Sequence, residues 1–424
     1  TADRIALGRY FLSLGNDARQ VLELFYDPVV KMEPDYLPAH YASAELALEK
    51  YDHALAAEIL HGAPQAARED PHYHYLLARA YADGDAAKFS AAIEGALAIN
   101  PRHAESLLLK VERLVDGEQY DAAKQIIDDV HKVNPRHPIA WAFAAVICHL
   151  RGDMQGDIDA REQALASWTT NPEVYHTIGR KLSDKYRFAE GAAYQRKALG
   201  FKSDYLPARM QLAQDLLRLG REEEGWQLVH DVFATDGYNV VAHNLVTLHD
   251  SFGEYRLVAN DSFKVRMESR EARIYGPEVL ALLERAKEKL CKKYDIVIDE
   301  PVIVEIFPHQ KDFAVRTFGI PGADGFLGVC FGNVITANSP AALGNSFANW
   351  EAVLWHEFCH VVTLLRPGGG APAVRRALST RAPRRMGDRD KYGARRPHLA
   401  RGAPAKPSRR DVVFATRVPQ AAPM

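Results

Sequence analysis

Through the first 250 residues, apolar and polar positions follow a helical pattern in segments that restart at regular intervals. Each segment reads as two helices separated by a short turn, as in EDPHYHYLLARAYADGDAAKFSAAIEGALAINP. A proline marks each restart, because proline cannot continue a helix and disfavours helical geometry in the residue before it. These prolines, 37, 30, 34 and 37 residues apart, are Pro34, Pro71, Pro101, Pro135 and Pro172. The pattern predicts a stack of helix pairs with a period near 34 residues.

Small residues and turn residues inside the segments indicate the same arrangement. Small residues stand where paired helices must approach closely, and glycines separate the two helices: Ala78, Ala144, Gly179 and Ala213, then Gly84, Gly117, Gly152 and Gly220. The segments resemble tetratricopeptide repeats, with about six units and a partial one at 238–250. One unit cannot bury its apolar face alone, so stacking makes a curved α-solenoid over residues 1–250. The resemblance implies that this array binds a protein or a peptide.

The pattern changes near residue 255, where a mixture of strands and helices begins. Residues 277–293 have helical spacing with a leucine-rich face. Residues 302–308, VIVEIFP, alternate at period two and predict a strand. A glycine-rich loop then leads into a further strand, GVCFGNVITANSP, and an apolar helix begins around Trp350. We expect an α+β domain over residues 255–365.

The last of these helices carries the motif His356-Glu357-Phe358-Cys359-His360. Residues four apart lie on one helix face, so His356 and His360 can direct neutral imidazoles at one Zn²⁺ ion. Glu357 is placed to accept a proton from zinc-bound water, whose pKa the metal lowers toward 7. A pair of partly buried histidines without a metal is the alternative interpretation. Cys359 lies one helical turn from His356, and a small buried hydrophobic role is its simpler interpretation.

Residues 255–365 resemble the gluzincin zinc metallopeptidases of the peptidase MA type, in the form fused behind tetratricopeptide repeats. The segments that carry the resemblance are GVCFGNVITANSP and NWEAVLWHEFCHVVTL. The resemblance implies that His356 and His360 are zinc ligands and that Glu357 is the general base and acid. It also implies that the strand at 328–337 binds an extended peptide by β-augmentation.

The chain departs from the gluzincin pattern at the third zinc ligand. Gluzincins supply this ligand as a glutamate on a later helix, within W-x-x-E-G, but no Glu follows Glu357. The metzincin pattern also fails, because Thr363 and Arg366 replace its glycine and its third histidine. The domain is therefore an incomplete zincin-like domain. The remaining candidates, none in a helical pattern, are Asp388, Asp390 and His398.

Two functions stay open from the sequence. The first is a zinc-dependent endopeptidase of the gluzincin type whose repeat array binds a protein substrate or partner. Without a third ligand this chain would be inactive, and Zn²⁺, expected in the intact domain, would bind weakly or not at all. The second is a non-catalytic tetratricopeptide scaffold for protein interaction. A glutamate in a helical context beyond His360 would decide between them.

Residues 366–424 differ sharply from the rest of the chain. They hold 13 Arg and 2 Lys against 3 Asp and no Glu, a balance of +12, which leaves −14 for the remainder. Periodicity ends as well, so we expect a disordered basic tail. We interpret the tail as the product of a shifted reading frame; a natural basic tail and a nucleic-acid-binding arm are the alternatives. Because only Tyr392 and Phe414 are aromatic, base stacking has little support, and we do not expect a nucleic-acid partner.

The remaining composition is that of an ordinary globular protein, with 47% apolar and 25% charged residues in 424. No stretch approaches 18 consecutive apolar residues, so we expect no membrane span. The four cysteines form no C-x-x-C, which argues against a disulfide framework or a thiolate zinc site. The chain begins with Thr1 in an array-like pattern, so we expect its natural N-terminus upstream. The peptidase resemblance favours an exported or periplasmic location over a cytoplasmic one.

Overall fold

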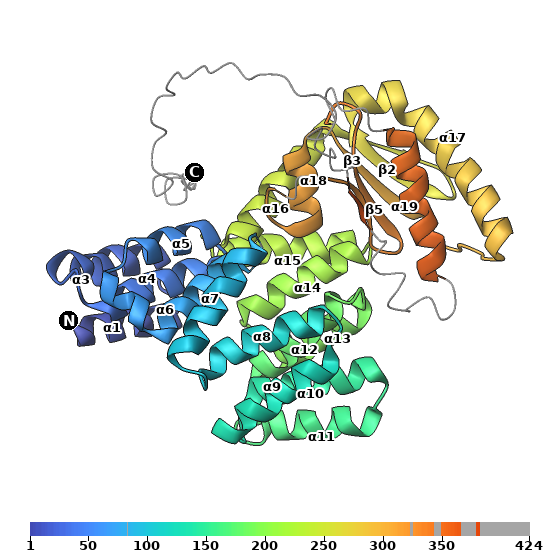
Figure 1. Ribbon diagram of the computed structural model, residues 1–424. Coiled ribbons are helices and arrows are strands. Elements are labelled where there is room, and N and C mark those ends of the chain that lie inside the picture. Colours follow the sequence, from blue (N-terminus) through green and yellow to red (C-terminus); the bar gives the residue numbers. More distant parts are fainter. Residues whose placement is uncertain (83, 323–324, 343–348, 366–378, 382–424) are drawn as a thin grey trace, which may run out of the picture.

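The computed structural model describes residues 1–82, 84–322, 325–342, 349–365 and 379–381 (Figure 1). An array of helices forms the first part, and a six-stranded sheet flanked by helices forms the second. The predicted fold class is confirmed: the chain is mainly α, with a solenoid followed by a smaller α+β part. Among the helices of these ranges, none is both long enough and apolar enough to cross a membrane.

Six helix pairs follow a short N-terminal group. That group contains α1 (Ala2–Ser13), α2 (Ala18–Val21), a π-helical turn η1 (Leu22–Tyr26) and α3 (Asp27–Met32). The first three pairs are α4 (Leu37–Glu49) with α5 (His53–His61), α6 (Pro71–Tyr81) with α7 (Ala86–Ile99), and α8 (Ala104–Asp116) with α9 (Tyr120–Val133); a short helix η2 (Gln65–Glu69) precedes α6. The next three are α10 (Pro138–Arg151) with α11 (Met154–Leu165), α12 (Pro172–Ser183) with α13 (Phe188–Phe201), and α14 (Leu206–Arg218) with α15 (Glu222–Thr235); α16 (Val240–Ser251) begins a seventh unit.

The first helix of each pair packs against the first helix of the next pair, from α4 through α6, α8, α10 and α12 to α14. The array therefore curves with its first helices inside. We call the face that these six helices form the inner surface. Proline opens three of the first helices, including α6 at Pro71 and α12 at Pro172, where a missing N–H costs no helical bond.

A residue with left-handed backbone geometry recurs in the turn inside the pairs. It is a glycine in two pairs, Gly152 and Gly220, with φ of 77° and 76°. In three other pairs it is Tyr51, Glu118 or Tyr186, with φ near 60°. From Glu118 to Gly220 these positions are 34 residues apart, which is the predicted period. The backbone therefore keeps the repeat at this position even in pairs where the residue is not a glycine.

Small residues allow the close packing that the sequence predicted. A Cβ atom at Gly179 would lie 2.9 Å from the carbonyl oxygen of Gly191, and one at Gly191 would lie 3.0 Å from the carbonyl oxygen of Gly179. The backbones of α12 and α13 are thus in direct contact. Ala78 and Ala213 are fully buried, whereas Ala144 is only partly buried.

The sheet of the second part has the strand order β1-β2-β3-β5-β4-β6. Its strands are β1 (Tyr255–Ala259), β2 (Phe263–Glu268), β3 (Val302–Phe307), β4 (Phe326–Cys330), β5 (Val334–Asn338) and β6 (Ser379–Arg381). The accompanying helices are η3 (Phe252–Glu254), α17 (Ser269–Tyr294), α18 (Gln310–Phe318) and α19 (Trp350–Leu365). Strands β2, β3 and β5 are parallel, and β1, β4 and β6 pair antiparallel with their neighbours.

Two predicted elements differ from the structure. The helix predicted at 277–293 begins at Ser269, because Pro277 lies inside α17 and does not end the helix there. The strand predicted at 328–337 is a hairpin, since the chain turns at Gly332, with φ of 107°, between β4 and β5. Of residues 366–424, the structure describes only β6; the others, on which the prediction of disorder falls, lie outside the described residues.

Strand β3 is buried on both faces, because the sheet lies between two helical layers (Figure 1). Val304 and Ile306 pack in one core with α17 and α19. Ile303 and Phe307 pack in another core with α14, α15 and α16 of the array. The array and the second part therefore share a continuous apolar core on one side of the sheet.

Glu305 interrupts the apolar run of β3 and faces the array. Its carboxylate, fully buried, lies 2.6 Å from the guanidinium nitrogens of both Arg266 on β2 and Arg316 on α18. Arg266 also pairs with Glu222 of α15 at 2.6 Å, and Arg316 donates a hydrogen bond to the carbonyl of Leu217 of α14 at 3.0 Å. This network ties the sheet to two helices of the array.

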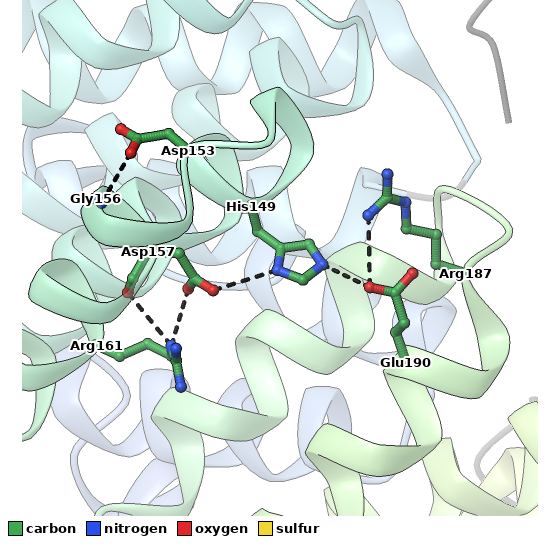
Figure 2. A network of polar contacts seen from close by, with 7 residues as sticks. All are labelled: His149, Asp153, Gly156, Asp157, Arg161, Arg187 and Glu190. Carbon is green, nitrogen blue, oxygen red and sulfur yellow. Dashed lines mark hydrogen bonds and ion pairs between the residues drawn. The ribbon is translucent and has the colours of Figure 1, made fainter. Parts of the chain in front are cut away.

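A second polar network lies within the array, around His149 of α10 (Figure 2). Its Nδ1 is 3.3 Å from Asp157 of α11, and its Nε2 is 2.6 Å from Glu190 of α13. These hydrogen bonds to Asp157 and Glu190 raise the pKa of His149 to about 9. The imidazole is therefore charged at neutral pH and joins three helices of two successive pairs.

His149→Gln should destabilise the chain by about 1–2 kcal/mol at pH 6, because hydrogen bonds to charged groups are lost. The folded pKa lies above the ordinary value of 6.5, so the stabilisation is complete below that value and disappears as pH rises through 9. Urea unfolding of both proteins from pH 6 to pH 10 measures this difference. Glu190→Gln should move the loss to lower pH, whereas a pH-independent difference would contradict the prediction.

Candidate metal and partner sites

Helix α19 lies on the sheet face opposite the array. Leu354, Phe358, Val361 and Val362 of this helix are buried in the core that α17 and the sheet share. The Phe358 ring packs 5.6 Å from the ring of Phe263 on β2. At its start, the side chain of Asn349 accepts the N–H of Ala352 at 3.1 Å, which satisfies a first-turn amide. Burial of these apolar residues thus fixes the rotation of α19 about its axis, and with it the directions in which its polar side chains point.

The two motif histidines converge on one side of α19. The Nε2 atoms of His356 and His360 are 2.9 Å apart, and the two rings are nearly perpendicular, with centroids 4.6 Å apart. His360 is buried and His356 is exposed. At this distance one imidazole can donate to the other, and the same convergence is what two nitrogen ligands of one metal ion require.

Glu357 points into the sheet and is fully buried. A Cβ atom at Gly328 of β4 would lie 2.8 Å from Cγ and 3.1 Å from Oε1 of Glu357. Only glycine at this position leaves room for the carboxylate side chain. Glu357 therefore lies against β4, beside the two histidines.

Two further residues near Glu357 were not identified from the sequence. Burial raises the pKa of the Cys330 thiol on β4, and the charge of Glu357 raises it further. Burial likewise raises the pKa of the Tyr186 phenol, with smaller contributions from Cys330 and Glu357. Tyr186 belongs to the α12–α13 turn and stacks at 6.2 Å on Phe331, next to β4. Nothing local in the sequence of that turn links it to a residue 171 positions away.

The described residues supply two of the three protein ligands that a catalytic zinc site requires. His356 and His360 fit a metal ion through their convergent nitrogens, but within these residues no group of three His, Cys, Asp or Glu side chains could hold one. Cys359 packs against the apolar core beside α19, and burial raises the pKa of its thiol. The other candidates for a third ligand, Asp388, Asp390 and His398, lie outside the described residues.

The strand predicted to bind a peptide lies inside the sheet, because both of its parts, β4 and β5, pair with a strand on each side. Strand β5 is interior, between β3 and β4, so its backbone cannot pair with another chain. Strand β4 pairs with β5 on one side and with β6 on the other, where Gly328 lies opposite Thr380. The outer side of β4, beside α19, thus accepts an antiparallel extended segment, and residues 379–381 occupy it.

A cavity of about 370 Å³ opens on the inner surface of the array. We call it the array cavity; most of its lining is charged and comes from α8 and α12: Glu112, Arg113, Asp116, Arg180, Lys181, Asp184 and Lys185, with Ala82, Phe89 and Leu109. Sequence reasoning missed these residues, because charged positions on a predicted helix are normally solvated surface.

Ion pairs across the array cavity join helices that are two repeats apart. Lys181 of α12 is almost fully buried, and its Nζ lies 2.7 Å from Asp116 and 2.6 Å from Asp184. Arg180 pairs with Glu112 of α8 at 2.5 Å. Burial alone would raise the pKa of Glu112, but Arg180 and Lys181 hold it well below its ordinary range. The carboxylate of Glu112 is therefore charged at neutral pH.

No protein-family model matches the chain, and neither does any curated protein. Among solved structures, a tetratricopeptide repeat protein from Parabacteroides merdae is 15% identical, with a TM-score of 0.37 over 58% of this chain and 97% of that one. PilW, a type IV pilus biogenesis factor, is 14% identical, with a TM-score of 0.32 over 46% of this chain and 91% of that one. The Cut9–Hcn1 hetero-tetramer of APC/C gives 13% identity and a TM-score of 0.37, over 53% of this chain and 45% of that one.

Similarities at these TM-scores carry no argument about activity. The tetratricopeptide-like character of the array rests on its own helix pairs, their period and their curvature. None of the comparisons supports the gluzincin resemblance of residues 255–365.

Gly328→Ala should destabilise the chain by about 1–3 kcal/mol, since a methyl group there overlaps the side chain of Glu357. Gly200→Ala is the matched control, because a Cβ atom at that helical position meets nothing within 4 Å. Thermal or urea unfolding measures both. The cost of Gly328→Ala should shrink in a Glu357→Ala background, and strictly additive effects would show that the two residues are not in contact.

Proposed function

We propose that the chain is a protein-interaction scaffold, whose repeat array binds a polypeptide partner on its inner surface. The array cavity is the observation that carries this proposal, because it offers about 370 Å³ of space on the inner surface, lined mostly by charged side chains. Its lining offers charged groups of both signs on two first helices, α8 and α12, that are two repeats apart. Such a lining suits the backbone and charged side chains of a polypeptide better than an apolar small molecule.

Arg113 is the side chain through which this proposal is best tested. It is exposed, lies 4.4 Å over the ring of Phe89, and donates a hydrogen bond to the carbonyl of Ala82. Arg113 is not a member of the ion pairs that join α8 and α12, so reversing its charge should leave those pairs intact. Lys132 of α9 is an exposed lysine outside the inner surface. Replacing it by glutamate changes the net charge of the chain by the same amount as Arg113→Glu.

Arg113→Glu should abolish capture of the partner, whereas Lys132→Glu should leave it unchanged. The immobilised chain and both variants are exposed to the same extract, and proteins bound by the unmodified chain are quantified by mass spectrometry. A partner lost only with Arg113→Glu supports the proposal. Equal capture by all three proteins would exclude the array cavity as the binding site.

We propose zinc-dependent peptide hydrolysis as the ancestral activity of the second part, on the strength of His356, His360 and Glu357. His356 and His360 would hold the metal, which when bound lowers the pKa of a coordinated water. Glu357 would accept the proton of that water. The outer side of β4, which residues 379–381 occupy here, would hold an extended substrate by main-chain hydrogen bonds if those residues were displaced. With two ligands in the described residues, we propose that this chain is inactive and serves as the scaffold.

Zinc should bind this chain with micromolar or weaker affinity, because two imidazoles alone make an incomplete ligand set. Isothermal titration of the whole chain measures the affinity and stoichiometry, and His360→Ala should remove even that weak binding. Glu357→Gln is the matched control, since it keeps both imidazoles. Tight 1:1 binding that His360→Ala abolishes, with casein cleavage that Glu357→Gln abolishes, would instead favour an active peptidase.

A further inference from the structure

The array returns on itself, so that its first repeat touches its last. Lys50, just after α4, contacts the turn between α15 and α16. We call this contact, made by Lys50, Tyr51, Asp236, Tyr238 and Val240, the seam. The Nζ of Lys50 is 2.8 Å from Asp236, and the carbonyl of Lys50 accepts the N–H of Val240 at 2.9 Å. The ion pair joins residues 186 positions apart, and the Asp236 carboxylate is largely buried.

Two tyrosines complete the seam on either side of this ion pair. The hydroxyl of Tyr238 donates to the carboxylate of Asp17 at 3.2 Å, and its ring packs against the core of the N-terminal helices. Tyr51, from the α4–α5 turn, packs against the core that α14, α15 and α16 share with the sheet. A tyrosine from the turn at each end of the array therefore packs against the apolar core of the other end.

The seam differs in kind from the other contacts of the array. Neighbouring helices elsewhere pack along their length and share apolar cores, such as the one that runs from α8 to α13. The seam is instead made by turns, whose contacts include the Lys50–Asp236 ion pair, the backbone hydrogen bond of Val240 and the hydroxyl contact of Tyr238. Beside them, a cavity of about 20 Å³ remains between Leu46, Leu55 and Tyr238. A contact of this kind can open without unfolding the helices that it joins.

We propose that the seam is a latch, which closes the array into a ring around its inner surface and opens to admit a partner. In the closed form, the array cavity of about 370 Å³ holds a short extended stretch of side chains but not a helix, whose diameter is about 10 Å. Separation of the first repeat from α16 would widen the access of a helical partner segment to the inner surface. The purpose of the latch rests on the proposed scaffold function, but its opening is a property of the chain alone.

Asp236→Asn is the variant that tests the latch most directly. Asparagine keeps the acceptor for the N–H of Tyr238, which the Asp236 side chain binds at 3.2 Å, and removes the charge that holds Lys50. Asp121→Asn is the matched control, because it removes the same charge from an exposed ion pair with Arg151 inside the array. Tyr238→Phe is a milder second variant, which removes the hydroxyl that contacts Asp17.

Hydrogen exchange of the Val240 amide and small-angle X-ray scattering are measured on the full chain and the three variants. Asp236→Asn should speed exchange at Val240 about tenfold and increase the radius of gyration, with a smaller effect from Tyr238→Phe. Amides in the helices away from the seam should keep their protection, and Asp121→Asn should change neither readout. Unchanged exchange at Val240, or equal loss of protection along the whole array, would overturn the proposal. Neither measurement involves a partner, so failure of the scaffold proposal would leave the result intact.

Discussion

The buried carboxylate of Glu305 is the constraint on which the joint architecture depends. A charge in a protein interior is tolerated only when it is paired, and this one is held between two arginines that come from different elements of the second part. One arginine continues to a glutamate of α15 and the other to a carbonyl of α14. The sheet can therefore lie against the array in only one orientation without leaving a buried charge unpaired. Because α19 occupies the other face of that sheet, the same pairing fixes where the histidine motif stands relative to the repeats.

The curvature of the array has an equally specific cause. Helix α10 is rich in alanine, with Ala140, Ala142 and Ala145 fully buried, so its neighbours approach it closely. As a result, side chains of α8 and α12 meet across α10 and form the ion pairs of the array cavity. A curvature this tight brings the ends of the array together after six helix pairs. The charged cavity thus depends on the small buried residues of α10.

The two parts form one body with two separate surfaces for chemistry. The inner surface of the array carries charged groups of both signs, and α19 presents the convergent histidines and Glu357 beside β4. Tyr186 belongs to a repeat turn yet stacks on Phe331 beside β4, where the charge of Glu357 contributes to its raised pKa. Removal of the array would expose the apolar face of the sheet, so the second part does not stand as an independent module.

Much of the local structure follows from sequence alone, because it depends on neighbours within a few residues. The restart prolines and the helical pattern predicted the paired helices and their period, and the i, i+4 spacing predicted that His356 and His360 share a face. The hairpin at Gly332 and the early start of α17 were missed, since one glycine or proline does not reveal which side of it the element continues. Glu305, the array cavity and the approach of Tyr186 to Glu357 could not be read locally, because each joins residues tens to hundreds of positions apart. Those contacts arise only when helix packing sets the curvature of the array and burial forces each charge to find a partner, and both are decided by the tertiary structure.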